Sequence, residues 1–217
     1  MNAAQAALPG LDAVYAALDL VPTAAQSETL LGYMGLLERW NAVYNLTAVR
    51  DRAGMLAQHL ADCLAVIPPL QRHIAGGRLL DVGSGGGLPG VVIATMLPGL
   101  DVTCVDSTAK KMAFVRQVSG ALCLPNLHAV HSRVETLRAP LFDVITSRAF
   151  ASLPEFTTLS GHQLAAGGVW VAMKGQVPAD EIASLPADVD VFHVEPLRVP
   201  GLDAQRCLVW MRPRGAE

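Results

Sequence analysis

The chain has 217 residues, of which 52% are hydrophobic and 16% are charged. This length and composition suit one globular domain with a full hydrophobic core, or one domain with an appendage. The net charge is −3 and the pI is about 6.0. These values exclude nucleic-acid binding through an overall positive field and leave only a local basic patch for that purpose.

Cysteine spacing and the N-terminal composition exclude several classes of protein. The four cysteines show no C-x-x-C pattern, so we expect buried thiols in a reducing cytoplasm, with no disulfide and no metal. The first 20 residues carry no Lys or Arg, unlike a secretion signal. No apolar run approaches the roughly 20 residues that span a bilayer. We therefore expect a soluble, cytoplasmic protein with no membrane partner.

Helical periodicity dominates the chain before residue 70. Residues 10–20 are expected to form a short helix, and Thr23 and Gln26 have capping-box spacing at the start of a longer one. In a further helix, His59 and Asp62 are three residues apart and are therefore neighbours on one face. Such a pair is either a structural hydrogen bond, which is the commoner case, or a catalytic dyad.

Prolines and glycines indicate where this helical region ends. Asp51 is a suitable N-cap for the last of these helices, and Pro68-Pro69 is expected to end it. Residues 71–77 then form a linker. We therefore expect an N-terminal helical region at 1–70 and a second domain at 71–217.

The most informative stretch is a glycine-rich turn that follows a short apolar strand. Residues 78–82 are expected to form the strand, and residues 91–97 the helix after the turn. Gly83 and Gly85 can adopt positive φ or let a ligand approach the backbone. The turn leads into a helix N-terminus, where free N–H groups favour negative groups. Ligands of open α/β sheets bind at this place.

The spacing of the glycines distinguishes between cofactors. A G-x-G-x-x-G frame exists at Gly85, Gly87 and Gly90, but it begins too late after the strand. Counted from the start of the turn, the sixth position is Leu88 and not glycine. The frame acid-x-Gly-x-Gly-x-Gly, which begins at Asp81, resembles the first motif of the Rossmann-like methyltransferases that use S-adenosylmethionine. In that class the acid faces the amino group of the cofactor's methionine moiety. A glycine-rich loop without a ligand is the remaining alternative.

Strand and helix patterns alternate from residue 78 onward, as a doubly wound parallel sheet requires. Strands are expected at 78–82, 101–106, 127–130, 143–146, 169–173, 189–198 and 206–212. Helices are expected at 109–122 and 153–165, with a turn at 166–168. The last two strands are too close in sequence for a crossover helix and should pair antiparallel. The predicted α/β fold is that of a Rossmann-like class I SAM-dependent methyltransferase. It has a seven-stranded, mostly parallel sheet, an antiparallel closing pair and an N-terminal helical extension.

Asp106 is a second candidate cofactor residue. It ends the second expected strand 23 residues after Gly83, the distance at which this fold places a carboxylate on ribose hydroxyls. The alternative is a surface Asp that caps the next helix, although Ser107 or Thr108 could cap that helix instead.

Basic residues indicate where a substrate would bind. Arg148 follows the fourth expected strand at the carboxyl edge of the sheet, so we expect it to point toward the cofactor or substrate rather than to form a simple salt bridge. Lys110, Lys111 and Arg116 lie on one short helix and suit a phosphate backbone. A solvated helix face is the commoner meaning of such a run.

These segments together resemble the RsmG family, also called glucose-inhibited division protein B, whose members are 16S ribosomal RNA guanine-N7 methyltransferases. The resemblance covers most of the chain in family order, at residues 39–51, 59–62, 81–90, 106–111, 132–135, 147–150 and 174–176. Asp62 is followed by Cys63 where the family usually has Ser, which is a small substitution.

The resemblance implies a cofactor, a substrate and a set of site residues. The cofactor S-adenosylmethionine would contact Asp81, Gly83, Gly85 and Leu88 on the glycine turn, Asp106 and Ser107 at the ribose, Val134 and Glu135 at the adenine, and Arg148 at the end of the fourth strand. The implied target is guanine 527 of 16S rRNA in the small ribosomal subunit. The basic candidates for RNA contact are Arg50, His59, Lys110, Lys111, Lys174 and Arg206. We expect a monomer.

Methylation of guanine N7 needs no catalytic residue. The fourth strand ends in Thr-Ser-Arg-Ala-Phe, not in the Asn/Asp-Pro-Pro-aromatic loop that grips an exocyclic amine, and no Pro-Cys nucleophile follows it. N7 has an in-plane lone pair and no proton to lose. Alignment of nitrogen, methyl carbon and sulfur in a dry site can contribute roughly 7 to 11 kcal/mol. We therefore assign no general base, and we expect the guanine to be unstacked.

Three alternatives remain. A methyltransferase could act on another RNA site, a small molecule or a protein. A dehydrogenase is disfavoured by Leu88 and by the antiparallel closing strands. A non-catalytic RNA-binding module is disfavoured because the glycine turn and Asp106 are both intact.

Overall fold

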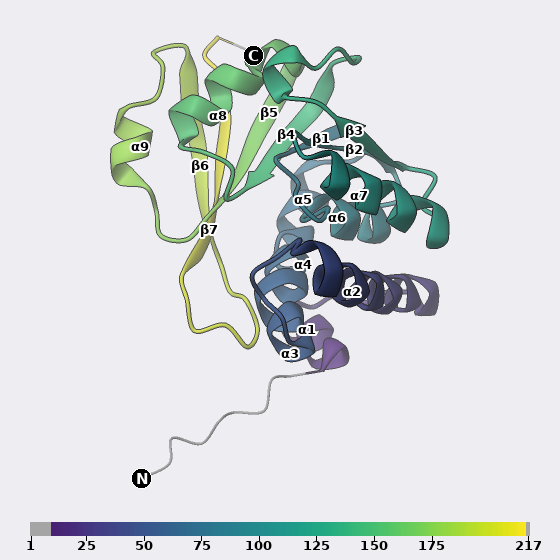
Figure 1. Cartoon of the computed structure of the whole chain (residues 1–217). Helices are drawn as coiled ribbons and strands as arrows, with labels where there is room; N and C mark the ends of the chain where they lie inside the picture. The colour runs from purple at the N-terminus through teal and green to yellow at the C-terminus, as the bar shows by residue number, and fades with distance from the viewer. Residues whose placement is uncertain (1–9, 216–217) are drawn as a thin grey trace.

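A single seven-stranded sheet forms the centre of the molecule (Figure 1). The computed structural model describes residues 10–215. The strands are β1 (Gly77–Val82), β2 (Leu100–Asp106), β3 (Leu127–His131), β4 (Phe142–Arg148), β5 (Leu164–Lys174), β6 (Val189–Leu197) and β7 (Arg206–Pro213). Their order is β3-β2-β1-β4-β5-β7-β6, in which β1 to β5 pair in parallel and β7 runs antiparallel to both of its neighbours. The predicted sheet and its antiparallel closing pair are confirmed.

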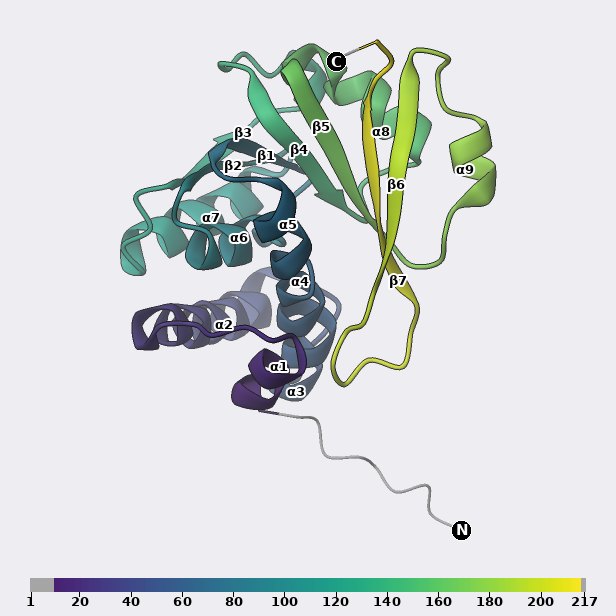
Figure 2. The ribbon, with the colours of Figure 1, turned by 180° about the vertical axis from the view of Figure 1, so that it is seen from behind.

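Helices cover both faces of this sheet (Figures 1 and 2). They are α1 (Leu11–Ala17), α2 (Ala24–Tyr44), α3 (Arg52–Met55), α4 (Asp62–Leu64), α5 (Ile67–His73), α6 (Gly90–Met96), α7 (Ala109–Ala121), α8 (Leu153–Ser160) and α9 (Ala179–Ala183), with a π-helical turn at Leu56–Ala61. Side chains alternate between the two faces because strand residues have a period of two. In β1, Leu79 belongs to the buried cluster that includes residues of α2, α6 and α7, whereas Leu80 and Val82 belong to the cluster that includes residues of α8.

The N-terminal helices share a hydrophobic core with one face of the sheet. Leu30 and Leu64 belong to the same buried cluster as Val91 of α6 and Phe114 of α7. We retain 1–70 and 71–217 as a proposed division of the chain, but the two parts are packed together as one core. Any change that loosens the N-terminal helices will therefore also affect the sheet.

The start of α2 follows the predicted capping box. The Thr23 side chain accepts a hydrogen bond from the Gln26 backbone, and the Gln26 side chain accepts one from the Thr23 backbone. The Gln26 amide also donates to the carbonyl oxygens of Thr95 and Met96, at 3.1 and 3.3 Å. Gln26 thus satisfies carbonyls at the C-terminus of α6, which would otherwise lack donors.

Two predicted boundaries are wrong, and each has a physical reason. Pro68-Pro69 does not end a helix but lies in the first turn of α5, where the missing N–H groups cost nothing. The helical region therefore continues to His73 instead of giving way to a linker at residue 71. The turn expected at 166–168 lies inside β5. There Gly167 has φ +75°, and the pairing with β4 shifts register between Phe142 and Val144, so the glycines form an irregularity in the strand.

The segment Arg52–His73 is apolar and long enough to cross a bilayer by length and composition alone, contrary to the expectation from the sequence. Its most apolar window has a mean hydropathy of 1.2, and 67% of that window is buried inside the protein. A core helix has these same properties. Among the cysteines, Cys63, Cys104 and Cys207 are buried and Cys123 is exposed, and all four are free.

The connection between β6 and β7 extends to the N-terminal helices, as both ribbon views show (Figures 1 and 2). Val199 in this connection is 4% exposed and belongs to the core cluster that includes the N-terminal helices. The connection ends at Arg206, which contacts Asp62 of α4. The C-terminal hairpin therefore closes one side of the carboxyl edge of the sheet.

We predict that the hydroxyl of Tyr33 stabilises the glycine turn. It donates a hydrogen bond of 2.9 Å to the carbonyl of Gly86, and Tyr33 is 1% exposed. In Tyr33→Phe, the free energy of unfolding should fall by about 1 kcal/mol, because one buried carbonyl loses its donor. Urea denaturation measures this change. Tyr44→Phe is the matched control, because Tyr44 is 42% exposed and its ring packs at a tilt against Trp40. An equal loss in both variants would contradict the prediction.

Candidate functional site

Two cavities lie along the carboxyl edge of the parallel strands. The larger has a volume of about 600 Å³ and the smaller about 420 Å³. Gly83 and Ala149 line both cavities, so the two meet at the ends of β1 and β4. Ligands of open α/β sheets bind at this edge.

The turn after β1 is shaped by hydrogen bonds and by the absence of side chains. Gly83 and Ser84 both donate to the carbonyl of Val105, at 2.9 and 3.2 Å. Gly83 has φ +66°, and a Cβ there would lie 2.5 Å from the ring of Phe150. Gly85 has φ +58°, and nothing lies within 4 Å of the position of its missing Cβ. A ligand can therefore approach the backbone of Gly85 directly.

Asp81 is buried behind this turn and lines neither cavity. Its Oδ2 accepts a hydrogen bond of 2.8 Å from the backbone N–H of Gly90, the first residue of α6. A Cβ at position 90 would lie 2.4 Å from the sulfur of Cys104, so only glycine allows α6 to approach this closely. Burial raises the pKa of Asp81 to about 7. Within the described residues, its Oδ1 has no hydrogen-bond partner.

Asp106, at the end of β2, joins the glycine turn to the smaller cavity. Its Oδ2 accepts from the N–H of Gly85 at 3.1 Å, and its Oδ1 accepts from the N–H of Thr108 at 2.8 Å. The ammonium group of Lys111 lies 3.5 Å from Oδ2. Asp106 lines the smaller cavity together with Ser107. The carboxylate thus both orders the backbone and faces the cavity.

In the larger cavity, one carboxylate holds two arginines. Asp62 of α4 is 3% exposed. Its Oδ2 accepts from Nη1 of Arg148 at 3.2 Å, and its Oδ1 accepts from Nε of Arg206 at 2.9 Å. Arg148 also donates to the carbonyl of Gln58 at 3.1 Å. Three distant segments of the chain are therefore tied together at one buried charge, and Arg148 does form a salt bridge in addition to facing the cavity.

His59 lines the same cavity and is held neutral. Its Nε2 lies 2.6 Å from Oγ1 of Thr47, so one of the two groups donates to the other. Burial, together with the positive charge of Arg148, lowers the pKa of His59. An imidazole whose pKa lies below 6.5 is uncharged at neutral pH. His59 and Asp62 do not bond to each other; they bond to Thr47 and to the two arginines, respectively.

The structure brings most of the predicted site residues together. The larger cavity is lined by Gly83, Gly85, Leu88, His59, Arg148, Lys174 and Arg206. The smaller cavity is lined by Gly83, Asp106, Ser107, Val134, Glu135 and Lys111. Asp81, Arg50 and Lys110 line neither cavity.

Several lining residues were not predicted from the sequence. Thr47, Asp62 and Ser84 line the larger cavity, and Phe150 lines the smaller one. Asp62 had a signal, because it is three residues after His59, but its partners are distant in sequence. Within residues 10–215, no group of three His, Cys, Asp or Glu side chains is placed to hold a metal ion.

We predict that Asp81 makes the stability of the protein dependent on pH. Its pKa is raised from 3.8 to about 7 in the folded protein, so the folded state binds a proton that the unfolded state releases between these values. The free energy of unfolding should therefore fall as pH rises through this range, by at most about 1.4 kcal/mol per pH unit.

Asp81→Asn tests this, because the amide oxygen can still accept from Gly90 but does not titrate. Relative to the wild type, the variant should gain stability between pH 5 and pH 8, as measured by urea denaturation at each pH. A difference that stays constant over this range would contradict the prediction.

Comparisons with known proteins agree on both the fold and the family. TrmN from Thermus thermophilus matches with a TM-score of 0.56 and 19% identity, over 73% of this chain and 53% of that chain. A SAM-dependent methyltransferase from Geobacter sulfurreducens, solved in complex with S-adenosyl-L-homocysteine, matches with a TM-score of 0.54 and 14% identity, over 70% of this chain and 91% of that chain. These likenesses show the class I methyltransferase fold.

Sequence comparison gives the family. The model of the GidB family, rRNA small subunit methyltransferase G, matches residues 26–209. A ribosomal RNA small subunit methyltransferase G from Acidovorax sp. (strain JS42) is 58% identical over 91% of each chain. Another, from Methylibium petroleiphilum, is 56% identical over 98% of this chain and 97% of its own. The chain therefore belongs to the rRNA small subunit methyltransferase G family.

Proposed function

We propose that the protein transfers a methyl group from S-adenosylmethionine to N7 of guanine 527 of 16S rRNA in the small ribosomal subunit. The observation that carries this proposal is the pair of cavities that meet at Gly83 and Ala149. One cavity has an acidic residue suited to a ribose, and the other has arginines suited to a nucleotide. The names of the family and of its relatives supply the substrate class.

The smaller cavity suits the adenosine part of the cofactor. A carboxylate that faces a cavity can accept hydrogen bonds from ribose hydroxyls, and Asp106 is fixed for this purpose by the N–H groups of Gly85 and Thr108. The open backbone at Gly85 gives the ligand a close approach. We propose that Ser107, Val134 and Glu135 complete this part of the site.

The methionine part would extend past Gly83 toward the larger cavity. Leu88 and Arg148 line this cavity, and we propose that they contact the ligand there. Asp81 would act through the turn rather than by direct contact, because it is buried and lines neither cavity. When bound, the cofactor supplies a methyl group on a positively charged sulfur.

The protein's own contribution would be alignment and exclusion of water. N7 of guanine carries its own lone pair, so no residue has to remove a proton, and we assign no catalytic residue. His59 is neutral and shares a hydrogen bond with Thr47. We therefore propose that it lines the cavity and takes no part in proton transfer. A looped-out guanine in the larger cavity would lie beside Arg148 and Arg206, whose N–H groups suit O6 of that base and would leave the N7 lone pair free for the methyl group.

The proposed RNA contacts differ in their accessibility. Arg50 is exposed, with a single hydrogen bond to Asn45, and Lys110 is exposed on α7. Arg206 faces the larger cavity. Lys111 and Lys174 each pair with a carboxylate of the same chain, which reduces their availability for phosphate. We further propose that the protein works as a monomer in the cytoplasm.

A second candidate function keeps the cofactor and changes the substrate to another RNA site or to a molecule other than RNA. The same cavities would serve, so only the methylated product separates the two functions. Transfer of a labelled methyl group to small subunits, naked 16S rRNA and protein would identify the acceptor.

We predict that small ribosomal subunits from cells that lack the gene will accept one methyl group at a single guanine when treated with the purified protein and S-adenosylmethionine. Chain cleavage specific for 7-methylguanine, read by primer extension, locates the site. Subunits from cells that have the gene are the control and should accept almost none. Methylation at another guanine or on another atom would favour the second candidate function.

We predict that Asp106→Ala weakens binding of S-adenosylmethionine by roughly 10- to 100-fold, because the ribose hydroxyls lose a charged acceptor and the glycine turn loses its anchor at Gly85. Isothermal titration calorimetry of the free protein measures this. Asp101→Ala is the matched control, since Asp101 lies near the other end of β2 and its side chain is 45% exposed. Unchanged affinity in Asp106→Ala would rule out the proposed ribose contact.

A further inference from the structure

A short loop, residues 149–153, separates the two cavities. Ala149 lines both, and Phe150 and Ala151 line the smaller one. The ring of Phe150 covers Gly83, since a Cβ on that glycine would lie 2.5 Å from it. The position of this loop therefore sets the width of the passage between the cavities.

The loop begins in a conformation that has to be held by its surroundings. Ala149 has φ +54°, a left-handed conformation that residues with a Cβ rarely adopt. Non-glycine residues in this region persist when neighbouring contacts over-determine them. Contacts beyond Ala149 must therefore hold the loop in place.

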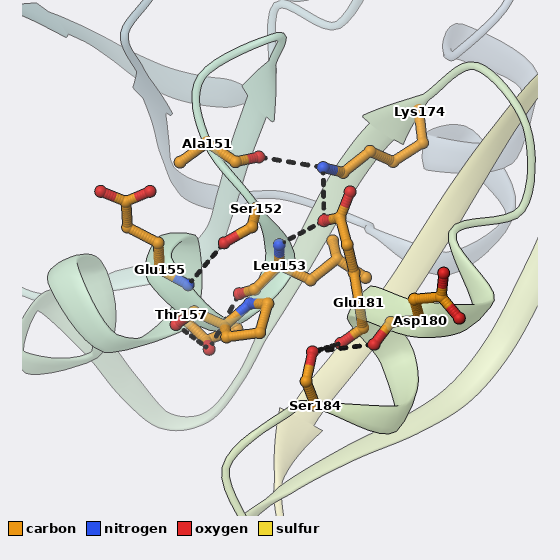
Figure 3. Close-up of polar contacts among 10 residues, drawn as sticks. Ala151, Ser152, Leu153, Glu155, Thr157, Lys174, Asp180, Glu181 and Ser184 are labelled. Atoms are coloured by element: carbon orange, nitrogen blue, oxygen red, sulfur yellow. Dashed lines mark hydrogen bonds and ion pairs between the residues drawn. The ribbon is translucent and has the colours of Figure 1, made fainter.

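One ammonium group and one carboxylate oxygen hold the far end of the loop, as Figure 3 shows. Nζ of Lys174, at the end of β5, donates to the carbonyl of Ala151 at 2.9 Å and to Oε2 of Glu181 at 2.8 Å. The same Oε2 accepts from the N–H of Leu153 at 2.6 Å. Glu181 belongs to α9, so an element outside the cavities fixes the loop between them.

Charge and burial fit this arrangement. The Lys174 side chain is 18% exposed and the Glu181 side chain 32%. Burial alone would raise the pKa of Glu181, but the hydrogen bonds from Lys174 and Leu153 lower it overall, so the carboxylate is ionised at neutral pH. Leu153 is the first residue of α8, and a negative charge is favourable at a helix N-terminus.

We propose that Lys174 and Glu181 are positioning residues that hold loop 149–153 and thereby set the passage between the cofactor cavity and the substrate cavity. This inference rests on the proposed function, and it assigns Lys174 to the loop rather than to RNA. The ammonium group of Lys174 is bonded within the protein, to the carbonyl of Ala151 and the carboxylate of Glu181. The two side chains act as one unit, because each orients the other.

A double-mutant cycle tests the proposal through binding of S-adenosylhomocysteine to the free protein, measured by calorimetry. Lys174→Met and Glu181→Ala should each weaken binding about tenfold, and the double variant should lose no more than either single variant. Glu181→Gln should stay within about threefold of the wild type, because its amide oxygen can accept both hydrogen bonds. Asp180→Ala is the matched control and should bind like the wild type, since Asp180 is exposed and its backbone carbonyl, not its side chain, is bonded.

A second measurement follows the rate of a single turnover on small ribosomal subunits at saturating cofactor. Displacement of the reacting groups by about 1 Å can cost about 100-fold, so the rates of Lys174→Met and Glu181→Ala should fall at least about tenfold. Circular dichroism checks that each variant is folded at the assay temperature. A purely structural role would lower the melting temperature and leave the affinity and rate of the folded protein unchanged.

Besides unchanged affinity and rate, three results would overturn the proposal. One is an additive loss of about 100-fold in the double variant. Another is a loss in Glu181→Gln as large as in Glu181→Ala. The third is weaker subunit binding with a flatter salt dependence in Lys174→Met alone, which would make Lys174 an RNA contact. A wild type that binds S-adenosylhomocysteine but does not methylate subunits would refute the proposed function, and the affinities would still decide whether the loop is held as proposed.

Discussion

The backbone of the turn at residues 83–90 is the constraint on which the rest of the site depends. It is held from four sides, by the carbonyl of Val105, the carboxylates of Asp81 and Asp106, and the hydroxyl of Tyr33. Each contact satisfies a backbone group that has no partner in a strand or helix, and a buried group of this kind is costly to leave unpaired. The turn is therefore fixed before any ligand binds, and a ligand can approach its backbone at Gly85, where no side chain intervenes.

Six of the seventeen residues that line the larger cavity come from the N-terminal helices and the loops between them, outside the sheet domain. Asp62 reaches Arg148 of β4 and Arg206 of β7, so the N-terminal helices, the centre of the sheet and the closing hairpin meet at one carboxylate. A buried pair of this kind contributes little net stability, because desolvation offsets the attraction, but removal of one partner leaves a buried charge and is strongly destabilising. The contact thus fixes geometry more than it adds stability, and the N-terminal helices are part of the site rather than an appendage.

The sequence predicted local features better than contacts between distant segments. The strand ends at Asp106 and Arg148 were recognised because short apolar runs and the distance from the glycine turn are local properties, and the structure places both residues on the cavities. The pairing of Asp62 with two arginines was not predicted, because its partners are 86 and 144 residues away along the chain. Pro68-Pro69 was misread because proline ends a helix interior but is accepted in a first turn.

Charge pairing around the larger cavity suits the chemistry of the proposed reaction. That reaction moves one positive charge from the sulfur toward the base, and an unpaired cation 4 Å from the base would oppose this by at most about 4 kcal/mol at an effective dielectric constant of 20. Arg148 and Arg206 share Asp62, Lys174 is paired with Glu181, and His59 is neutral. The two guanidinium groups can therefore offer hydrogen bonds while one of their two positive charges is offset by Asp62. A cavity lined with unpaired cations would bind RNA phosphate more strongly and would hinder the methylation step.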